Sequence, residues 1–440
     1  MGAKVGDDYT FLADFLQEYP STFIRCQWVD YSGIVRARNI TADYAKHLAR
    51  SHGAMATGAT PGTHLEGIFD NTKLPDYDRT VTDSIYPDWK SLRPTAIQSC
   101  NSGAYASVMC FCIKSDSENI CPREALRQTL DSARRDAGLE FLIGFELEIM
   151  ITSTRDRNYQ AQPLCHGSSS AASCRTAEFE VIEGCVHDLL KMGIGVQTFH
   201  AEGDGAQYEI ALSPLPPLEG VDALVLATEL VRTNANKAGF HATLHPRPFA
   251  DRSSNALHVH VSIDPLDKED LFLSGVLNRL PAICAFTMPF DDSYSRLQSG
   301  EDGLWVTWGT QNRDAPIRKI HAGRWEFRPL DATANPFLAV AAILRAGLLG
   351  IQNNETLRHG NCRAKLRNLN QSQMTALGID TRLPVSLSEA LQQLASEDSG
   401  LTDAIGSHLV RRIQYVKKHQ LQVIEQYSKE EVKNLMLAVY

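Results

Sequence analysis

Four short segments alternate large apolar residues with Glu, His, Gln or Arg, and this pattern constrains the fold more than any other feature. The segments are residues 143–150 (IGFELEIM), 207–210 (QYEI), 257–263 (LHVHVSI) and 324–328 (RWEFR). Residues i and i+2 of a strand share a face, so each segment predicts a strand with one apolar and one polar face. Taken singly, each is typical of an edge strand whose polar face lies in water. Taken together, they predict one core and a sheet that curves around a polar cavity, because the polar faces carry neither Lys nor Thr.

Five glutamates would meet in that cavity with the imidazole of His258. They are Glu146, Glu148, Glu202, Glu209 and Glu326. Carboxylates gathered in one cavity repel one another strongly unless cations neutralise them. Hard oxygen ligands beside an imidazole suit Mg²⁺ or Mn²⁺ better than zinc. Because residues i and i+2 lie roughly 6–7 Å apart along a strand, Glu146 and Glu148 are placed to serve two different metals.

Arginines follow the carboxylates in the sequence. Arg313 and Arg318 stand in the segment NRDAPIR, shortly before Arg324 and Arg328. Guanidinium groups beside a metal cluster suit a polyphosphate together with a carboxylate substrate. The chain carries neither a GxxxxGK[ST] loop nor a GxGxxG turn after a strand. A bound nucleotide would therefore be held by metals and arginines rather than by a phosphate-binding loop.

Composition and charge narrow the class of protein. The 440 residues are 43% hydrophobic and 22% charged, as is typical of folded globular proteins. A net charge of −9 without a basic run argues against a nucleic-acid partner. No uninterrupted apolar run reaches about 18 residues, so no membrane partner is expected, and the N-terminus shows no signal-peptide pattern. Ten cysteines without a CxxC motif then favour a cytoplasmic protein with reduced thiols.

Local patterns predict the elements around these segments. Residues 21–40 predict a β-hairpin, residues 52–78 a long loop rich in Gly, Thr, Pro and Asn, and residues 105–113 a strand. Pro122 predicts the first turn of a helix, because proline is favoured there. From Pro336 onward the chain is expected to be mostly helical, beginning with a buried helix.

The segments GFELE, HAEGDGAQYE, HVHVS, NRDAPIR and GRWEFRPLDATANPFLAVAAILRAGLLGI resemble the signature motifs of the glutamine synthetase family, in matching order across about 144–351. The resemblance implies an α+β fold with a small β-grasp-like N-terminal domain. It also implies a large catalytic domain whose antiparallel sheet forms a half-barrel flanked by helices. A polar stretch at residues 113–121 places the boundary, so we expect domains over 1–115 and 116–440. The resemblance further implies a homo-oligomer of stacked rings, with each active site between adjacent subunits.

The activity that the resemblance implies is ATP-dependent ligation of a small-molecule carboxylate and an amine. The γ-phosphoryl group passes to the carboxylate, and the amine then displaces phosphate from the acyl phosphate. One metal would be bound by Glu148, Glu202 and Glu209, and the other by Glu146, His258 and Glu326. The residues that match nucleotide contacts are His260, Ser262, Arg318 and Arg324.

Further positions match the catalytic and acid-binding residues of the family. Arg313 and Arg318 match the arginines that stabilise the transferring phosphoryl group. Arg296 and Arg328 match the arginines that hold the substrate carboxylate. Glu301 lies near the position of a general-base glutamate in a flap, one residue out of alignment.

Two further departures from the family pattern concern the two co-substrates. The family's N-terminal Asp, which takes a proton from ammonium, has no counterpart in residues 54–59 (AMATGA). The glycine-rich loop that approaches the acid is here residues 253–258 (SSNALH), with Ser254 and Ala256 in place of two glycines. These changes favour a ligase that uses an amine other than ammonia or an acid other than glutamate. The alternatives are an authentic glutamine synthetase, with Glu301 or another group replacing the Asp, and a catalytically weak regulatory homologue.

Overall fold

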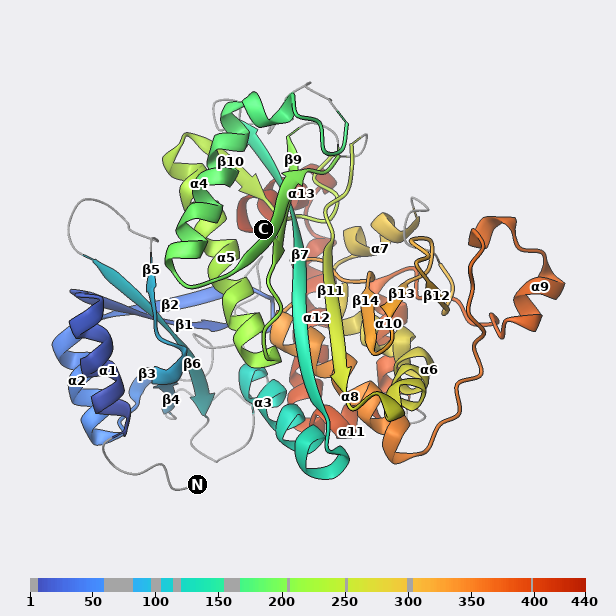
Figure 1. Ribbon diagram of the computed structural model, residues 1–440, viewed down its shortest axis with the longest axis horizontal. Coiled ribbons are helices and arrows are strands. Elements are labelled where there is room, and N and C mark those ends of the chain that lie inside the picture. The colour runs from blue at the N-terminus through green and yellow to red at the C-terminus, as the bar shows by residue number, and fades with distance from the viewer. Residues whose placement is uncertain are drawn as a thin grey trace.

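The computed structural model describes residues 7–58, 82–95, 104–113, 120–153, 167–203, 206–249, 252–298, 304–396 and 399–440. Within these ranges the strands form two sheets, and Figure 1 shows the smaller one beside the N-terminus and the larger one crossing the middle of the molecule. Each sheet buries its own hydrophobic cluster. Tyr31 and Met109 of the N-terminal part belong to the larger cluster, so the two cores are in contact. The expected α+β architecture is confirmed.

The smaller sheet is built from the N-terminal segments. Its elements are α1 (Asp7–Glu18), β1 (Phe23–Val29), β2 (Val35–Thr41), α2 (Ala42–Ser51), β3 (Met55–Gly58), β4 (Thr82–Pro87), β5 (Arg93–Thr95) and β6 (Tyr105–Ile113). The strand order is β2-β1-β6-β4-β3, with β5 also paired to β6. The predicted hairpin is β1–β2 and the predicted strand is β6, so both predictions are confirmed. The expected loop from residue 52 was wrong at its start, because Met55–Gly58 pairs with β4 as a strand.

The larger sheet contains the four predicted two-faced strands as neighbours. Its strands are β7 (Glu140–Ser153), β8 (Val196–Ala201), β9 (Gln207–Leu212), β10 (Phe240–Thr243), β11 (Leu257–Asp264), β12 (Trp308–Thr310), β13 (Ile317–His321) and β14 (Arg324–Phe327). The order is β12-β13-β14-β11-β7-β9-β8, with β10 paired to β7. The four strands β14, β11, β7 and β9 are adjacent and antiparallel. Their apolar residues are buried, as Phe145, Leu147 and Val259 illustrate.

The hydrophobic cluster of this sheet takes in residues of helices α3 (Pro122–Ser132), α4 (Ala177–Lys191), α5 (Pro217–Lys237), α6 (Glu269–Thr287), α7 (Asp291–Gln298), α8 (Pro336–Gln352), α10 (Leu387–Ala395), α11 (Leu401–Ile405) and α12 (Ser407–Ile424). Two further helices, α9 (Gln371–Ala376) and α13 (Lys429–Val439), belong to separate clusters. The predicted buried helix is α8, which packs closely on α6. A Cβ on Gly275 of α6 would lie 2.6 Å from the backbone nitrogen of Gly350 in α8, so the two backbones can meet only at glycines. None of the described helices combines the length and apolar character needed to cross a membrane.

A buried arginine ties the two parts of the chain together. Arg123, in the first turn of α3, donates to both carboxylate oxygens of Asp222 in α5, at 2.9 and 2.7 Å. Its Nη2 also donates to Asp88, which follows β4, at 2.8 Å. The predicted boundary between residues 115 and 116 lies outside the described residues.

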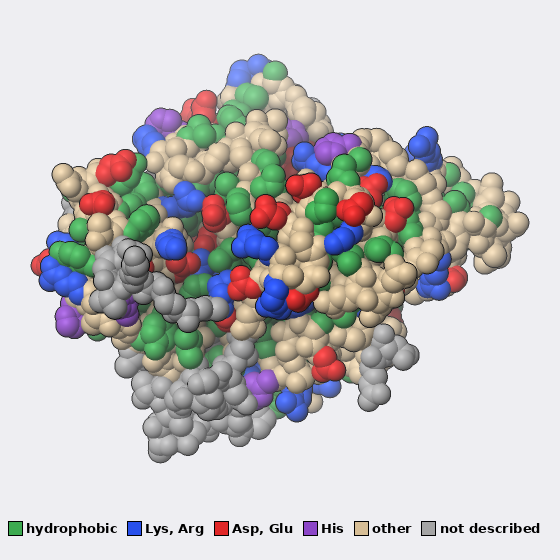
Figure 2. All heavy atoms as spheres, turned by 60° about the horizontal axis from the view of Figure 1, so that its bottom comes forward, with side chains coloured by type: hydrophobic (Ala, Val, Ile, Leu, Met, Phe, Trp, Pro, Cys, Tyr) green, Lys and Arg blue, Asp and Glu red, His purple; other side chains and the backbone are tan. Residues whose placement is uncertain are grey.

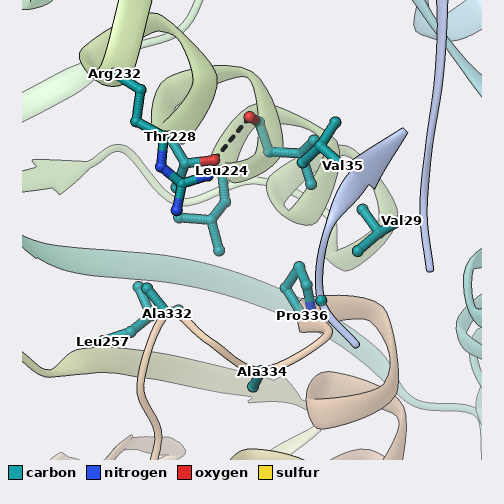
Figure 3. A pocket seen from close by; sticks show the side chains of 11 residues that line it. Val29, Val35, Leu224, Thr228, Arg232, Leu257, Ala332, Ala334 and Pro336 are labelled. Carbon is teal, nitrogen blue, oxygen red and sulfur yellow. Dashed lines mark hydrogen bonds between the residues drawn. The ribbon is translucent and has the colours of Figure 1, made fainter. Parts of the chain in front are cut away.

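The hairpin, α5 and the segment before α8 converge around a small cavity. Figure 3 shows Val29 and Val35 of the hairpin facing Leu224 of α5 and Pro336 of α8. The cavity measures about 30 Å³, which is room for roughly one water molecule rather than a substrate. This junction is therefore structural. On the face turned forward in Figure 2, basic and acidic side chains are interspersed over the coloured surface.

Candidate active site

The polar faces of the larger sheet line one cleft of about 510 Å³. Most of the predicted site residues line it, namely Glu146, Glu148, Glu202, Glu209, Ser254, His258, Arg296, Arg313, Arg318, Glu326 and Arg328. The pairing of the strands explains this, since His258 stands opposite Glu146, Glu148 opposite Glu209, and Arg318 opposite Glu326. Residues opposite one another in adjacent strands share a face. The polar residues that alternate along each strand thus form one continuous charged surface across the four strands.

Glu146 lies between two histidines of β11. Its Oε1 is 2.9 Å from His260 Nε2, and its Oε2 is 3.3 Å from His258 Nδ1. Burial alone would raise the pKa of Glu146, but the hydrogen bonds and charges of the two imidazoles outweigh it and hold the pKa below its usual range. Glu146 is therefore an ionised carboxylate at the centre of the cleft.

Glu326 completes the first group of possible metal ligands. Within the described ranges, Glu146, His260 and Glu326 form the one group of three whose ligand atoms all lie within 4.8 Å of one another. His258 Nδ1 is close to the same carboxylates, at 3.3 Å from Glu146 and 3.5 Å from Glu326. His258 Nε2 is buried and has no hydrogen-bond partner in the described part of the chain. Both imidazoles of β11 thus face this group, although the sequence assigned one to the metal and the other to the nucleotide.

The second carboxylate group is strongly repulsive. Burial, followed by the charges of Glu146, Glu148, Glu202 and Glu326, raises the pKa of Glu209 to about 8. Burial also raises the pKa of Glu148, partly opposed by His258 and by the backbone N–H of Ala256. Bound divalent cations would remove this repulsion. The donor set, oxygen-rich with imidazoles at its edge, fits Mg²⁺ or Mn²⁺.

Gln207 holds several parts of the cleft in place. Its Nε2 donates to Ser254 O at 2.8 Å and to Asn255 Oδ1 at 2.9 Å, and it lies 3.3 Å from Glu148 Oε2. A Cβ on Gly203 would lie 2.2 Å from Gln207 Oε1, so only glycine fits beside it. The sequence placed Gln207 on the polar face but not among the functional residues. The sequence signal that could have identified it is an amide side chain two residues before Glu209, on a strand face that otherwise carries carboxylates.

The arginines converge on Glu326 and on the backbone beyond it. Arg328 Nη1 donates to Glu326 Oε1 at 2.6 Å. Arg318 Nε lies 2.5 Å from Glu326 Oε2, but its N–H does not point at that oxygen, so this contact is an ion pair rather than a hydrogen bond. Arg296 is buried and donates to Arg328 O at 3.0 Å and Leu330 O at 3.2 Å. Arg296 thereby fixes the segment that carries Arg328.

Of the predicted nucleotide contacts, His260 and Arg318 pair with the carboxylates Glu146 and Glu326, whereas Ser262 and Arg324 lie further along the strands. Arg324 Nη2 lies 3.5 Å from His260 Nδ1, and Arg324 stands opposite Ser262 in the strand pairing. Ser262 lines a separate hollow of about 360 Å³, with Leu142 and Pro216 among its walls. The cleft and this hollow together give the sheet an acidic end and a less polar end.

Two predicted regions cannot be placed in the cleft. Glu301 lies outside the described residues. In residues 54–59, Met55 is buried and Thr57 pairs in register with Asp83 of β4. Asp83 is itself fully buried. The described residues that line the cleft all fall between Glu146 and Arg328, so none comes from the N-terminal sheet.

One family match and three relatives place the chain among known proteins. Residues 119–435 match the family described as glutamine synthetase, catalytic domain. Protein fluG of Emericella nidulans is 33% identical over 419 residues, covering 92% of this chain but only 47% of fluG, so the chain spans about half of that protein. Glutamine synthetase of Halobacterium salinarum is 27% identical over 439 residues, covering 94% of this chain and 93% of that enzyme. The gamma-glutamylpolyamine synthetase GlnA3 of Streptomyces coelicolor is 27% identical over 411 residues, covering 85% and 86%.

Solved structures agree on the fold. A GmaS/ADP complex superposes with a TM-score of 0.79 at 21% identity, covering 97% of this chain and 99% of that one. A structure described as a novel glutamine synthase homolog superposes with a TM-score of 0.77 at 24% identity, covering 96% and 99%. The half-barrel sheet with its flanking helices is thus the architecture of these proteins as well. Together with the match over residues 119–435, this shows that the chain belongs to the glutamine synthetase family.

Proposed function

We propose that this chain is an ATP-dependent carboxylate–amine ligase that forms an amide through an acyl phosphate, with an organic amine or an acid other than glutamate as co-substrate. One observation carries the proposal: the six side chains expected to bind metal line one cleft together with Arg296, Arg313, Arg318 and Arg328, while residues 54–59 contain no carboxylate for ammonium. This supports phosphoryl transfer from ATP to the carboxylate as the first step, and it allows an amine other than ammonia in the second step.

The metal positions would serve the phosphoryl transfer. Mg²⁺ or Mn²⁺, when bound by Glu146, His258 and Glu326 and by Glu148, Glu202 and Glu209, would neutralise the phosphate oxygens and align ATP. His260, Ser262 and Arg324 would contact the nucleotide along the same sheet face. Retention of all these groups speaks against a catalytically weak homologue, because buried carboxylates without cations are costly to fold around.

The arginines act on the transferring group and on the acid. Arg328, with its backbone fixed by Arg296, would hold the substrate carboxylate. An oxygen of the reacting carboxylate attacks the γ-phosphorus, the bond to the bridging oxygen breaks, and ADP leaves. Arg313 and Arg318 would stabilise the negative charge on the phosphoryl oxygens during this step. The amine nitrogen then attacks the acyl carbon, loses a proton, and phosphate leaves.

The amine side distinguishes the leading function from plain glutamine synthesis. The small, uncharged Ala56 and Thr57 stand in the sequence where the family resemblance implies an Asp, so a site that admits an alkyl or aryl group is expected. The relative GlnA3 is named a gamma-glutamylpolyamine synthetase, so an organic amine has a precedent among similar proteins. The halobacterial relative named glutamine synthetase covers 94% of the chain, against 85% for GlnA3, and keeps authentic glutamine synthesis as the second candidate.

We also propose that the chain works in the cytoplasm as a homo-oligomer of stacked rings. The support is the make-up of the cleft, whose described lining lacks any contribution from the smaller sheet. The N-terminal sheet of a neighbouring subunit would complete the amine side in such a ring. Sedimentation of the purified protein would test this, and a stable active monomer would contradict it.

An isotope experiment tests the reaction class. Full-length protein with ATP, Mg²⁺ and a panel of acids and amines should release ADP and phosphate only when a productive pair is present. With the acid labelled by ¹⁸O in its carboxylate, one labelled oxygen should appear in the released phosphate, because the acyl phosphate transfers it. Removal of Mg²⁺ and Mn²⁺ should abolish the release. Formation of AMP and pyrophosphate, or unlabelled phosphate alongside amide, would contradict the proposal.

A further inference from the structure

His200 lines the same cleft and has no part in the proposed mechanism. It lies on β8, directly opposite Glu209 in the pairing with β9. Its Nε2 is 3.1 Å from Glu202 Oε2 and 4.0 Å from Glu209 Oε1. The side chain is 29% exposed, so it is neither a core residue nor a fully solvated one. An imidazole therefore faces two of the three carboxylates proposed for one metal.

Two distances from His200 fall in the range of the ligand spacing of an octahedral ion, although its group is looser than that of Glu146, His260 and Glu326. With metal–ligand bonds of about 2.1 Å, neighbouring donors lie about 3.0 Å apart and opposite donors about 4.2 Å apart. The separation of 3.1 Å between His200 and Glu202 is close to the first value, and the separation of 4.0 Å between His200 and Glu209 is close to the second. The pairing opposite Glu209 and the contact with Glu202 thus place one imidazole nitrogen near oxygens of two carboxylates at once.

The third carboxylate of the group is already oriented. Glu148 stands opposite Glu209 in the strand pairing. Its Oε2 accepts the backbone N–H of Ala256 at 2.8 Å and faces Gln207 Nε2 at 3.3 Å. This group is more open than that of Glu146, His260 and Glu326, whose ligand atoms lie within 4.8 Å. Repulsion among its carboxylates opposes closure until a cation neutralises them.

We propose that His200 Nε2 is a further ligand of the metal held by Glu148, Glu202 and Glu209, and that it biases this position toward Mn²⁺ over Mg²⁺. A nitrogen donor strengthens binding of transition metals, whereas Mg²⁺ keeps oxygen ligands and water. The inference rests on the proposed function, because it assumes that these carboxylates bind a metal. It adds a metal preference that the carboxylates alone do not supply.

Calorimetric titration of the full-length protein tests the ligand. Mn²⁺ and Mg²⁺ are titrated separately into wild type, His200→Ala, and His187→Ala, which alters an exposed histidine of α4. Loss of His200 should lower the affinity for Mn²⁺ at one class of sites by about 10-fold or more. The affinity for Mg²⁺ should fall clearly less, so the ratio of Mn²⁺ affinity to Mg²⁺ affinity falls. The His187→Ala variant should keep the wild-type ratio. An unchanged ratio, or equal weakening of both ions, would overturn the inference and leave His200 as a residue that orders Glu202.

A second measurement uses only the wild-type protein, so its result does not depend on whether His200→Ala folds correctly. With two equivalents of Mn²⁺ bound, electron spin-echo spectroscopy should detect nitrogen coupling at both ions. Coupling at one ion alone would overturn the inference while leaving the proposed function intact. Failure of wild type to bind any divalent ion would instead overturn the proposed function as well.

Discussion

Arg328 Nη1 lies 2.6 Å from Glu326 Oε1, so an arginine proposed to hold the acid is paired with a proposed metal ligand. Arg318 Nε lies 2.5 Å from the other oxygen of the same carboxylate. Glu326 is fully buried, and these contacts are strong in such surroundings. A cation bound by Glu326 would compete with both arginines and release them toward the substrates.

The first prediction concerns the coupling between metal binding and the affinity for the acid. The acid should bind at least about 10-fold more tightly with Mn²⁺ present, because the cation draws the charge of Glu326 away from Arg328. Calorimetric titration of the acid with and without Mn²⁺ measures the difference. Glu326→Gln keeps the shape and removes the charge, so in this variant acid affinity should no longer depend on Mn²⁺. Equal acid affinity in wild type with and without Mn²⁺ would show that Glu326 does not restrain Arg328.

The second prediction concerns Arg313. It lines the cleft and is solvent-exposed, so its removal should leave the core intact. Arg313→Ala should lower kcat by roughly 10²–10³-fold, because one positive group that stabilises the transferring phosphoryl is lost. Steady-state kinetics with the best substrate pair measures this, and Arg367→Ala, at an exposed position outside the cleft, is the control. A kcat near that of wild type would remove Arg313 from the catalytic set.

The third prediction concerns Gln207. Its amide links Glu148 to the loop that carries Ser254, so Gln207→Met should disturb both the metal and the acid. Mn²⁺ affinity should fall by about 10–100-fold, as is typical when a group that orients a metal ligand is lost, and the KM for the acid should rise. Gln197→Met, at an exposed position on β8, should change neither quantity. If the two variants behave alike, Gln207 does not position the cleft.

The fourth prediction concerns the link between the two sheets. Arg123 is 3% exposed, and Arg123→Ala would leave Asp222 buried without its partner. The loss should cost about 3–5 kcal/mol in the first urea unfolding transition. Arg127→Ala removes partly exposed ion pairs within the same helix and should cost about 1 kcal/mol or less. Similar unfolding midpoints for the two variants would show that the Arg123 ion pairs do not stabilise the junction.

Much of the cleft could be predicted because strand alternation is a local property. The spacing of Glu146 from Glu148, and of His258 from His260, already decides which side chains share a face. Their convergence in one cleft then needed only that the four strands be neighbours, which the structure confirms.

Other features depended on contacts between distant segments. Met55–Gly58 is strand β3 because it pairs with β4, although Gly and Ala are poor strand formers. His200 stands at the cleft only through the pairing of β8 with β9. The carbonyls that bind Arg296 lie more than thirty positions away, so its role in fixing the segment of Arg328 had no local signal.

The choice of amine is the central claim of the account. Losing one carboxylate beside an ammonium ion costs on the order of 2–5 kcal/mol, which corresponds to roughly 30-fold or more in the ammonia requirement. Each methylene of an organic amine that becomes buried contributes about 0.8 kcal/mol in return. The most direct test is a competition assay in which ammonia and a panel of primary amines, polyamines included, share one acid with the full-length protein. The account predicts a higher kcat/KM for at least one organic amine than for ammonia, whereas ammonia with glutamate outcompeting every amine would identify a plain glutamine synthetase and contradict it.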